Sequence, residues 1–260
     1  MRKTKHSDKG NGIKISFFCN LFFVLFSCCG CCDLFTGVPQ EPTIYRNGYF
    51  EYSFCREFSR FADQDDDSIA IVGLTETGYM QETLDIPQEI DGYTVSKLGV
   101  ELDGAFNGSS YAIFYGSDNL KKIFIFHNIE FANFDLRNVD LMVCSNDVFD
   151  YIPNHSEYIK NVFFDHCFFE QNEFLPNSCS KEANVTFLLN LPSSNTRDIY
   201  RIDNVNIENE IIEPTPPVTE NYKFTGWYTE PECKNVWDFS DKLELEQIEF
   251  IDLYAGWSNL

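Results

Sequence analysis

The residues best suited to chemistry are few, and the nearest approach to a ligand cluster is His166-Cys167 followed by Cys179. A structural zinc site usually takes four Cys or His ligands at short spacings such as C-x-x-C. This stretch has no C-x-x-C pair and no second His beside the first. We therefore predict buried thiols here and no bound metal. The cysteines beyond the N-terminal segment are odd in number and irregularly spaced, unlike a disulfide framework: Cys55, Cys144, Cys167, Cys179 and Cys233.

An acidic run at residues 63–68 is the second candidate for cation binding. Its acids at alternate positions are similar to the first half of a calcium loop. Such a loop needs glycine at its sixth position and a bidentate glutamate at its twelfth, where this chain has Ser68 and Leu74. The run is therefore predicted to be a solvated turn between two strands.

No motif for nucleophilic or phosphate chemistry is present. The chain lacks G-x-S-x-G, H-E-x-x-H and a P-loop. Its four histidines are widely separated: His6 lies in the N-terminal segment, and His127, His155 and His166 lie in the region of residues 44–178. A dyad of Cys167 and His127 would require the fold to bring them together, and nothing in the sequence indicates this. We expect no enzymatic activity and no cofactor.

The elements that would position functional residues begin with short apolar repeats at residues 44–178. Strand-like runs at 49–54 and 69–72 come first and indicate a hairpin region. The template Leu-x-x-Ile-x-Ile then recurs, with apolar substitutions, from Leu120, Leu136 and Ile159. Each copy predicts one short strand facing a shared core, and the irregular spacing predicts a degenerate stack of repeats.

The most regular part of this region is L-x-I-P-x-x-I-x-G-x-x-V, from Leu84 to Val95, followed by Ala105-Phe106. It resembles the opening of BspA-type leucine-rich repeats. The resemblance implies a short solenoid with an N-terminal hairpin region, and it implies a role in adhesion.

The C-terminal part is rich in aromatic residues around single glycines. Strands are predicted at 185–189, 199–202 and 205–207, and the prolines of 214–217 cannot join a central ladder. Gly226 beside Trp227 predicts a bend where a large ring crosses the backbone. We predict that one small core uses Phe224, Gly226, Trp227, Tyr228, Trp237, Tyr254 and Trp257.

Three blocks in this part carry a second resemblance. They are Gly226-Trp227-Tyr228, Trp237-Asp238-Phe239 and the closing Leu253-Tyr254-Ala255-Gly256-Trp257. Together they resemble the Listeria–Bacteroides repeat, also called the internalin B-repeat, over about 183–257. The resemblance implies a small β-grasp-like module at 183–260, of a kind found in extracellular chains of bacteria. The chain is thus predicted to be mainly β.

Residues 1–32 have the pattern of an export segment. A basic start is followed by the apolar run 15–26 and by a cysteine cluster. Leu25-Phe26-Ser27-Cys28 resembles a bacterial lipobox, and Cys31 after Gly30 offers a second register. Lipidation at Cys28 or Cys31, an uncleaved anchor and plain secretion remain as alternatives. Each places the body of the chain, after a linker at 33–43, outside the cytoplasm.

The formal net charge of −22 limits the partners. An acidic field of this size repels phosphate backbones, so no nucleic acid is expected as a partner. We expect a non-enzymatic adhesion or binding protein, anchored at the bacterial cell surface by the N-terminal lipid or anchor. Its repeat surface would engage a surface or extracellular protein or a glycan. The alternative is a structural envelope lipoprotein without a discrete ligand.

Overall fold

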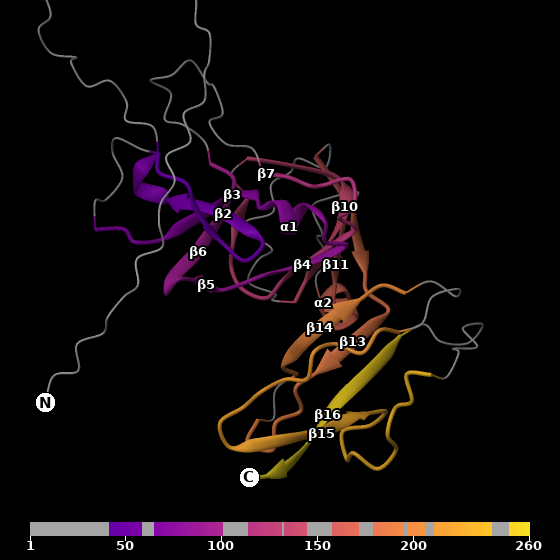
Figure 1. Cartoon of the computed structure of the whole chain (residues 1–260). Helices are drawn as coiled ribbons and strands as arrows, with labels where there is room; N and C mark the ends of the chain where they lie inside the picture. Colours follow the sequence, from indigo (N-terminus) through magenta and orange to yellow (C-terminus); the bar gives the residue numbers. More distant parts are fainter. Residues whose placement is uncertain are drawn as a thin grey trace, which may run out of the picture.

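A computed structural model of the chain describes residues 42–58, 65–100, 114–131, 133–144, 158–171, 179–194, 197–205, 211–240 and 250–260. This part is built mainly of strands in several sheets, which confirms the prediction of a mainly β chain (Figure 1). Cys28, Cys31 and Ala105-Phe106 lie outside the described residues. Within the described ranges, no helix has the length and apolar character needed to cross a membrane.

The chain enters the fold through an antiparallel meander of β1 (Tyr45–Asn47), β2 (Phe50–Phe54) and β3 (Ile69–Leu74). β3 then pairs in parallel with β6 (Tyr93–Leu98), and β6 also pairs with β5 (Glu89–Ile90) and β9 (Glu130–Phe131). Two short helices, η1 (Cys55–Glu57) and α1 (Glu76–Tyr79), lie in the connections. The predicted hairpin region is therefore one sheet that continues into the repeats.

A second sheet, which we call the parallel ladder, forms the body of the repeat region. Its strands are β4 (Thr83–Ile86), β8 (Lys122–Ile125), β10 (Phe134–Val143), β11 (Ile159–Phe164) and β12 (Ser180–Glu182). They lie side by side in chain order, and every pairing between them is parallel. The short β7 (Phe114–Tyr115) pairs with the start of β10, and α2 (His166–Gln171) follows β11.

The register of the ladder tests the repeat alignment directly. Leu84 lies opposite Ile123, as the predicted alignment requires. In the next copy, however, Leu141 and not Val139 lies opposite Ile123. The predicted pairing was therefore wrong by two residues. A shift of two keeps every apolar residue on the same face, so the hydrophobic pattern alone could not reveal it.

The apolar residues of the ladder and of the first sheet share one core. The fully buried members of the ladder include Leu84, Ile123, Leu141 and Val162. Residues from β3 and β6 complete this core, so the two sheets pack against each other through their inner faces. None of the five described cysteines forms a disulfide, and Cys144 and Cys179 are buried.

A third sheet forms the C-terminal module, in the order β14 (Ile199–Asp203), β13 (Val185–Leu188), β16 (Ile251–Asn259) and β15 (Tyr222–Tyr228) (Figure 1). The predicted strands at 185–189 and 199–202 are present. The described part of the third predicted strand, Val205, is not in a strand. The proline segment 214–217 lies outside the sheet, as predicted.

The module core forms on one face of this sheet. Trp227 is buried among Phe187 and Phe224, with Trp237 and Trp257 partly buried around the same cluster. Phe224 and Trp227 can share this face because the register shifts at Gly226, whose φ is +140°. This bulge lies at the predicted bend, where glycine tolerates the backbone angle.

Tyr228 and Tyr254, which we predicted in the module core, instead lie outside this cluster. Successive side chains of a strand point to opposite faces, so Tyr228 cannot accompany its neighbour Trp227. The Tyr228 ring lies against Gly256, where an added Cβ would come within 2.2 Å of the ring. Tyr254 pairs with Tyr228 across the two strands.

The module joins the ladder through a small apolar cluster on the ladder's outer face. Phe124, Met142 and Phe163 of the ladder pack with Ala183 and Ile202 of the module. Met142, Ala183 and Ile202 are completely buried. The outer face of the ladder is therefore a second, minor core, and it fixes where the module sits.

Candidate functional site

The two-residue shift in the ladder has a defined location in β10. Leu136 lies opposite Ile159, and Asp140 lies opposite Asn161. Residues 137–139 of β10 therefore face the single residue Lys160 of β11. A bulge of this kind bends its strand and redirects side chains, and bulges are common beside binding sites.

The bulge interrupts the alternation of buried and exposed side chains. Leu136 and Val139 are buried, while Arg137 and Asn138 between them both point to solvent. Two adjacent polar side chains thus project from the same place on the ladder. Arg137 and Asn138 are the two residues for which the repeat template has no position.

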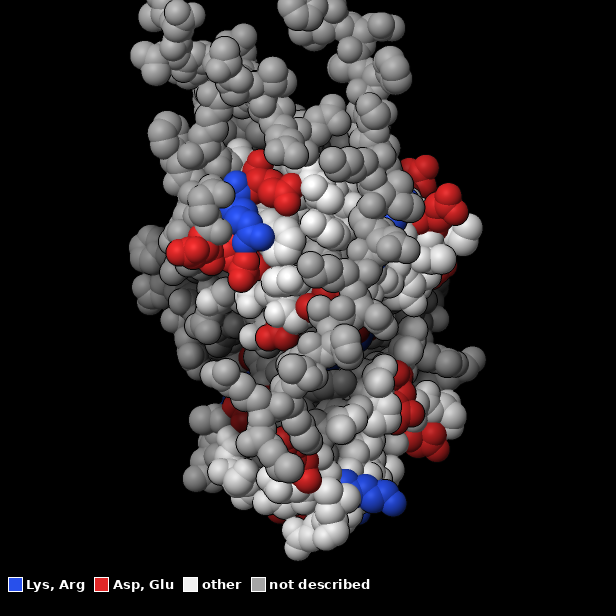
Figure 2. All heavy atoms as spheres, turned by 60° about the vertical axis from the view of Figure 1, so that its left-hand side comes forward, with Lys and Arg blue, Asp and Glu red and all other residues white. Residues whose placement is uncertain are grey.

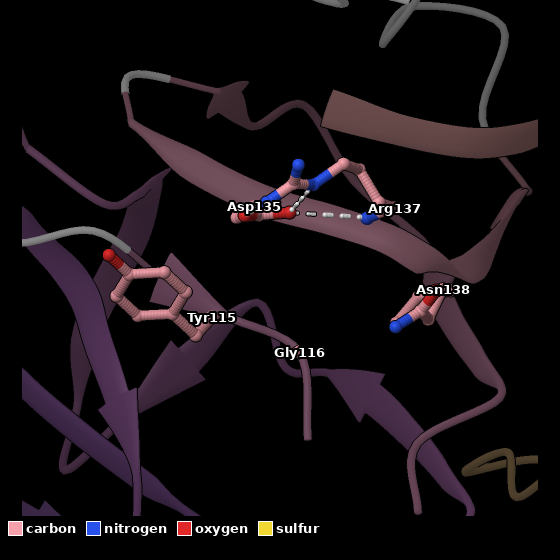
Figure 3. Close-up of a pocket in the computed structure, with 6 residues that line it drawn as sticks. Tyr115, Gly116, Asp135, Arg137 and Asn138 are labelled. Carbon is pink, nitrogen blue, oxygen red and sulfur yellow. Dashed lines mark hydrogen bonds and ion pairs between the residues drawn. The ribbon is translucent and has the colours of Figure 1, made fainter. Parts of the chain in front are cut away.

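A hollow of about 360 Å³ opens beside this bulge. It is lined by Tyr115, Gly116, Asp135, Arg137, Asn138 and Val139. Figure 3 shows Tyr115 and Asn138 on opposite sides of Gly116, with the Asp135–Arg137 pair along β10 beyond them. We call this hollow the bulge pocket. Its volume falls in the range of about 300–1,000 Å³ that is typical of small-molecule sites.

The charges in the bulge pocket neutralise each other. Arg137 Nε donates to Asp135 Oδ1 over 2.9 Å, and Nη2 binds the second carboxylate oxygen. This bidentate pair holds the pKa of Asp135 below its usual range and raises the pKa of Arg137. The pocket is therefore polar, carries fixed hydrogen-bonding groups and has no net charge of its own.

Gly116 is the residue that allows the pocket floor to approach β10. Its amide donates to the Asp135 carbonyl over 3.0 Å. A Cβ at this position would lie 2.8 Å from Val139 Cγ2 and 3.4 Å from Leu136 Cδ2. Any larger residue would push the segment after β7 away from the bulge, so the shape of the pocket depends on glycine here.

Exposed tyrosines flank the same site. Tyr115 is 51% exposed and Tyr158, just before β11, is 41% exposed. Both lie close enough to Arg137 to affect its pKa. Large aromatic rings left in solvent beside convergent polar groups are a common feature of ligand sites.

A larger hollow of about 820 Å³ lies where the module meets β4 and β8. Its cations are held by carboxylates across or along the groove: Lys122 by Asp203, Lys121 by Glu82 and Arg201 by Asp85. Arg201 also covers the Phe124 ring, with its guanidinium carbon 3.4 Å from the ring centre. Two of these pairs, Lys122–Asp203 and Arg201–Asp85, connect the module to the ladder. We therefore regard the groove as a junction and the bulge pocket as the better candidate site.

The three residues that came nearest to a ligand cluster in the sequence, His166, Cys167 and Cys179, do not lie together as one set. Cys179 is buried in the ladder core, while His166 Nε2 lies 3.4 Å from Cys167 Sγ. Asp165 joins this pair, and the three possible ligand atoms lie within 4.8 Å of one another. Asp165 Oδ1 already accepts hydrogen bonds from Arg197 and Thr186, at 2.9 and 2.8 Å. The Arg197 guanidinium is in contact with the Asp165 carboxylate, and its positive charge opposes the binding of a metal cation there.

The other residues considered for chemistry, His127 and the acidic run, also make contacts that give them a structural role. His127 Nε2 contacts the Val95 carbonyl at 3.1 Å, and burial lowers the pKa of His127. Cys167, with which His127 would have to form a dyad, contacts His166. In the described part of the acidic run, Asp66 Oδ1 accepts from the Ser68 amide over 2.8 Å, as in a turn before β3.

Sequence reasoning missed the four polar and aromatic residues of the bulge pocket: Tyr115, Asp135, Arg137 and Asn138. The apolar pattern gave no signal for them, because Leu136-x-x-Val139-x-Leu141 fits the template without a gap. Only the pairing of Leu141 and Val143 with Ile123 and Ile125 reveals the two extra residues.

Comparison with known proteins identifies only the C-terminal part. Residues 184–255 match the family model of the Listeria-Bacteroides repeat domain. This interval contains most of the module sheet and its aromatic cluster. Neither a search of curated proteins nor a search of solved structures gives a match.

Proposed function

We propose that this chain is a non-enzymatic binding protein of the bacterial cell surface, and that the bulge pocket is its ligand site. The observation that carries the proposal is the exposed set of Tyr115, Arg137 and Asn138 around a hollow on the repeat surface. A purely structural repeat surface has no need for a bulge that turns two adjacent polar side chains outward.

Within this proposal, residues 44–178 form a degenerate leucine-rich-repeat solenoid of the BspA type. Parallel strands that stack in chain order support it, because successive turns of one repeat produce that arrangement. The module of 183–260 then presents or spaces the repeats, with a small β-grasp-like core. The match at 184–255 supports an extracellular location by resemblance to that family.

The N-terminal segment supplies the attachment in this proposal. Lipid at Cys28 or Cys31, or an uncleaved apolar anchor, would hold the chain at the membrane. The acidic surface agrees with an exposed, soluble body that does not lie against anionic lipid. Figure 2 shows acidic side chains spread along one face and only a few basic ones.

The test is binding of the labelled full chain to cell-surface fractions, compared with a variant that lacks Arg137 and Asn138. The deletion leaves Leu136-Val139-Asp140-Leu141-Met142-Val143, which restores the Leu-x-x-Leu-x-Val spacing of the template. We expect it to retain the far-ultraviolet spectrum of the wild type and to lose binding.

A matched substitution separates the site from a general effect of charge. Arg137→Ala should weaken binding, whereas Arg46→Ala should not, although Arg46 also forms an exposed pair with a carboxylate, Glu51. If neither the deletion nor Arg137→Ala changes binding, the bulge pocket is not the site. If the wild type binds no fraction, the structural envelope role is favoured.

A further inference from the structure

The ligand that fits the bulge pocket carries little or no charge. Asp135 and Arg137 satisfy each other, and the remaining lining residues are Tyr115, Gly116, Asn138 and Val139. An anionic ligand would find no unpaired cation among the lining residues, and it would have to approach a chain of net charge −22. A cationic ligand would have to compete with Arg137 for the only carboxylate.

The pocket nevertheless offers several hydrogen bonds at fixed places. Arg137 uses Nε and Nη2 for Asp135, so its Nη1 is still able to donate within the described surroundings. The Asn138 amide, which is exposed, provides donors and an acceptor. Neighbouring hydroxyl groups on one small molecule can donate and accept in this way, whereas a purely apolar ligand would leave these groups unsatisfied.

An apolar surface completes the set. Tyr115 is 51% exposed, and its ring stands across Gly116 from Asn138 (Figure 3). A ring face of this kind suits a flat molecule that has C–H groups on one side and polar groups at its rim. The two features together, an aromatic face and convergent hydrogen-bonding groups, match a sugar ring.

An extended peptide fits the same place poorly. β10 pairs with β7 at residues 134–135 and with β8 at residues 140–143, and β11 lies on its other side. The stretch of β10 left between these pairings is too short for a peptide strand to add to it. The hollow of about 360 Å³ is at the small end for ligand sites. Its lining also lacks a deep apolar hole for an anchoring side chain.

We infer that the bulge pocket binds an uncharged sugar unit of a surface glycan, with Tyr115 stacked on the ring and Arg137 and Asn138 bonded to its hydroxyls. This inference rests on the proposed function and names its ligand class. No bond is made or broken, so the activity is recognition only.

The test is a panel of immobilised oligosaccharides of glucose, galactose, mannose and N-acetylglucosamine, with sialylated and sulfated sugars beside them. The labelled full chain should be retained by at least one neutral sugar and not by the anionic ones alone. Tyr115→Ala should weaken that binding about two- to tenfold, the range expected for loss of one aromatic contact. Asn138→Ala should also weaken it.

The matched control is Tyr79→Ala, since Tyr79 is 45% exposed but lies in α1, outside the pocket. Equal binding by Tyr115→Ala, Asn138→Ala and Tyr79→Ala would overturn the inference, as would retention by anionic sugars only. Retention of no sugar would overturn it too.

Failure of the inference can be told apart from failure of the proposed function. Periodate oxidation of the cell-surface fraction destroys sugar rings with vicinal hydroxyls and leaves most protein surfaces intact. If the full chain binds the oxidised fraction as well as the native one, and Arg137→Ala still weakens binding, the ligand is a protein. The binding function then stands and the glycan is excluded.

Discussion

The indole of Trp227 gives a prediction in which burial and hydrogen bonding act in opposite directions. Trp227 is 1% exposed, and its ring packs 4.9 Å from Phe187 and 5.3 Å from Phe224, measured between ring centres. Its Nε1 is buried without a hydrogen-bond partner in the described part of the chain. Trp257 Nε1, by contrast, donates to the Leu189 carbonyl over 2.6 Å.

These contacts determine how much each substitution should change the free energy of unfolding. Trp227→Ala should cost about 3–5 kcal/mol, as expected for a buried large aromatic. Trp227→Phe loses about two buried carbons, near 0.8 kcal/mol each. It also removes an unsatisfied N–H group, which relieves about 1–3 kcal/mol of desolvation cost. The net change for Trp227→Phe should therefore lie between about 0.6 kcal/mol of destabilisation and about 1.4 kcal/mol of stabilisation.

The matched control is Trp257→Phe. This change removes a hydrogen bond worth about 0.5–1.5 kcal/mol and leaves the Leu189 carbonyl without it. Trp257 is only partly buried, yet it should tolerate phenylalanine less well than Trp227 does. Burial alone predicts the opposite order.

Urea unfolding of the full chain, followed by far-ultraviolet circular dichroism, measures all three variants. The midpoint should fall strongly for Trp227→Ala, slightly for Trp257→Phe and hardly at all for Trp227→Phe, with similar slopes. If Trp227→Phe is as damaging as Trp227→Ala, then the Trp227 N–H group is satisfied in the folded chain and the reasoning fails.

Four further outcomes are expected. The pKa of Asp165 lies below its ordinary value, so its contribution to stability is present at neutral pH and is lost as pH falls below about 4; Asp165→Asn should flatten that part of a stability–pH curve. Burial raises the pKa of Cys144 to about 12, so a thiol reagent at neutral pH should label it only after unfolding. Incorporation of a fatty-acid analogue in a bacterial host should disappear when Cys28→Ser and Cys31→Ser are combined, and unchanged incorporation would exclude the lipobox. Residues 183–260 expressed alone should give a dispersed amide NMR spectrum, whereas a collapsed one would show that their core depends on the repeats.

The strands β4, β8, β10 and β11 of the ladder were predictable because the apolar spacing within each copy is strict, whereas β12 lies where the sequence predicted a border between two parts. Leu84 and Ile86 align with Ile123 and Ile125 in sequence and pair with them in the structure. The next copy was placed two residues away from its true register. A strand pattern repeats every two residues, so it fixes the buried face but leaves an even shift undetermined.

The C-terminal module shows a different limit of prediction from the sequence. Its aromatic residues were expected to share one core because large rings are usually buried. Backbone geometry separates them: the bulge at Gly226 brings Phe224 and Trp227 to one face, and strand alternation sends Tyr228 to the other. Alternation was readable from the sequence, whereas the partner of Tyr228 at Gly256 required the pairing of β15 with β16.

β10 connects the candidate site to the module. Its first half carries Asp135, Arg137 and Asn138 at the bulge pocket, and its second half buries Met142 against Ile202. Its neighbours β8 and β11 meet it in register through residues 140–143, so the bulge changes one strand without disturbing the pairing beyond it. The same two-residue insertion that defeats the repeat alignment therefore produces the candidate site in the described part of the repeats. Because the buried residues Leu136, Val139 and Leu141 pack beneath the bulge, they fix the backbone from which Arg137 and Asn138 project, which is the kind of support that a preorganised site requires.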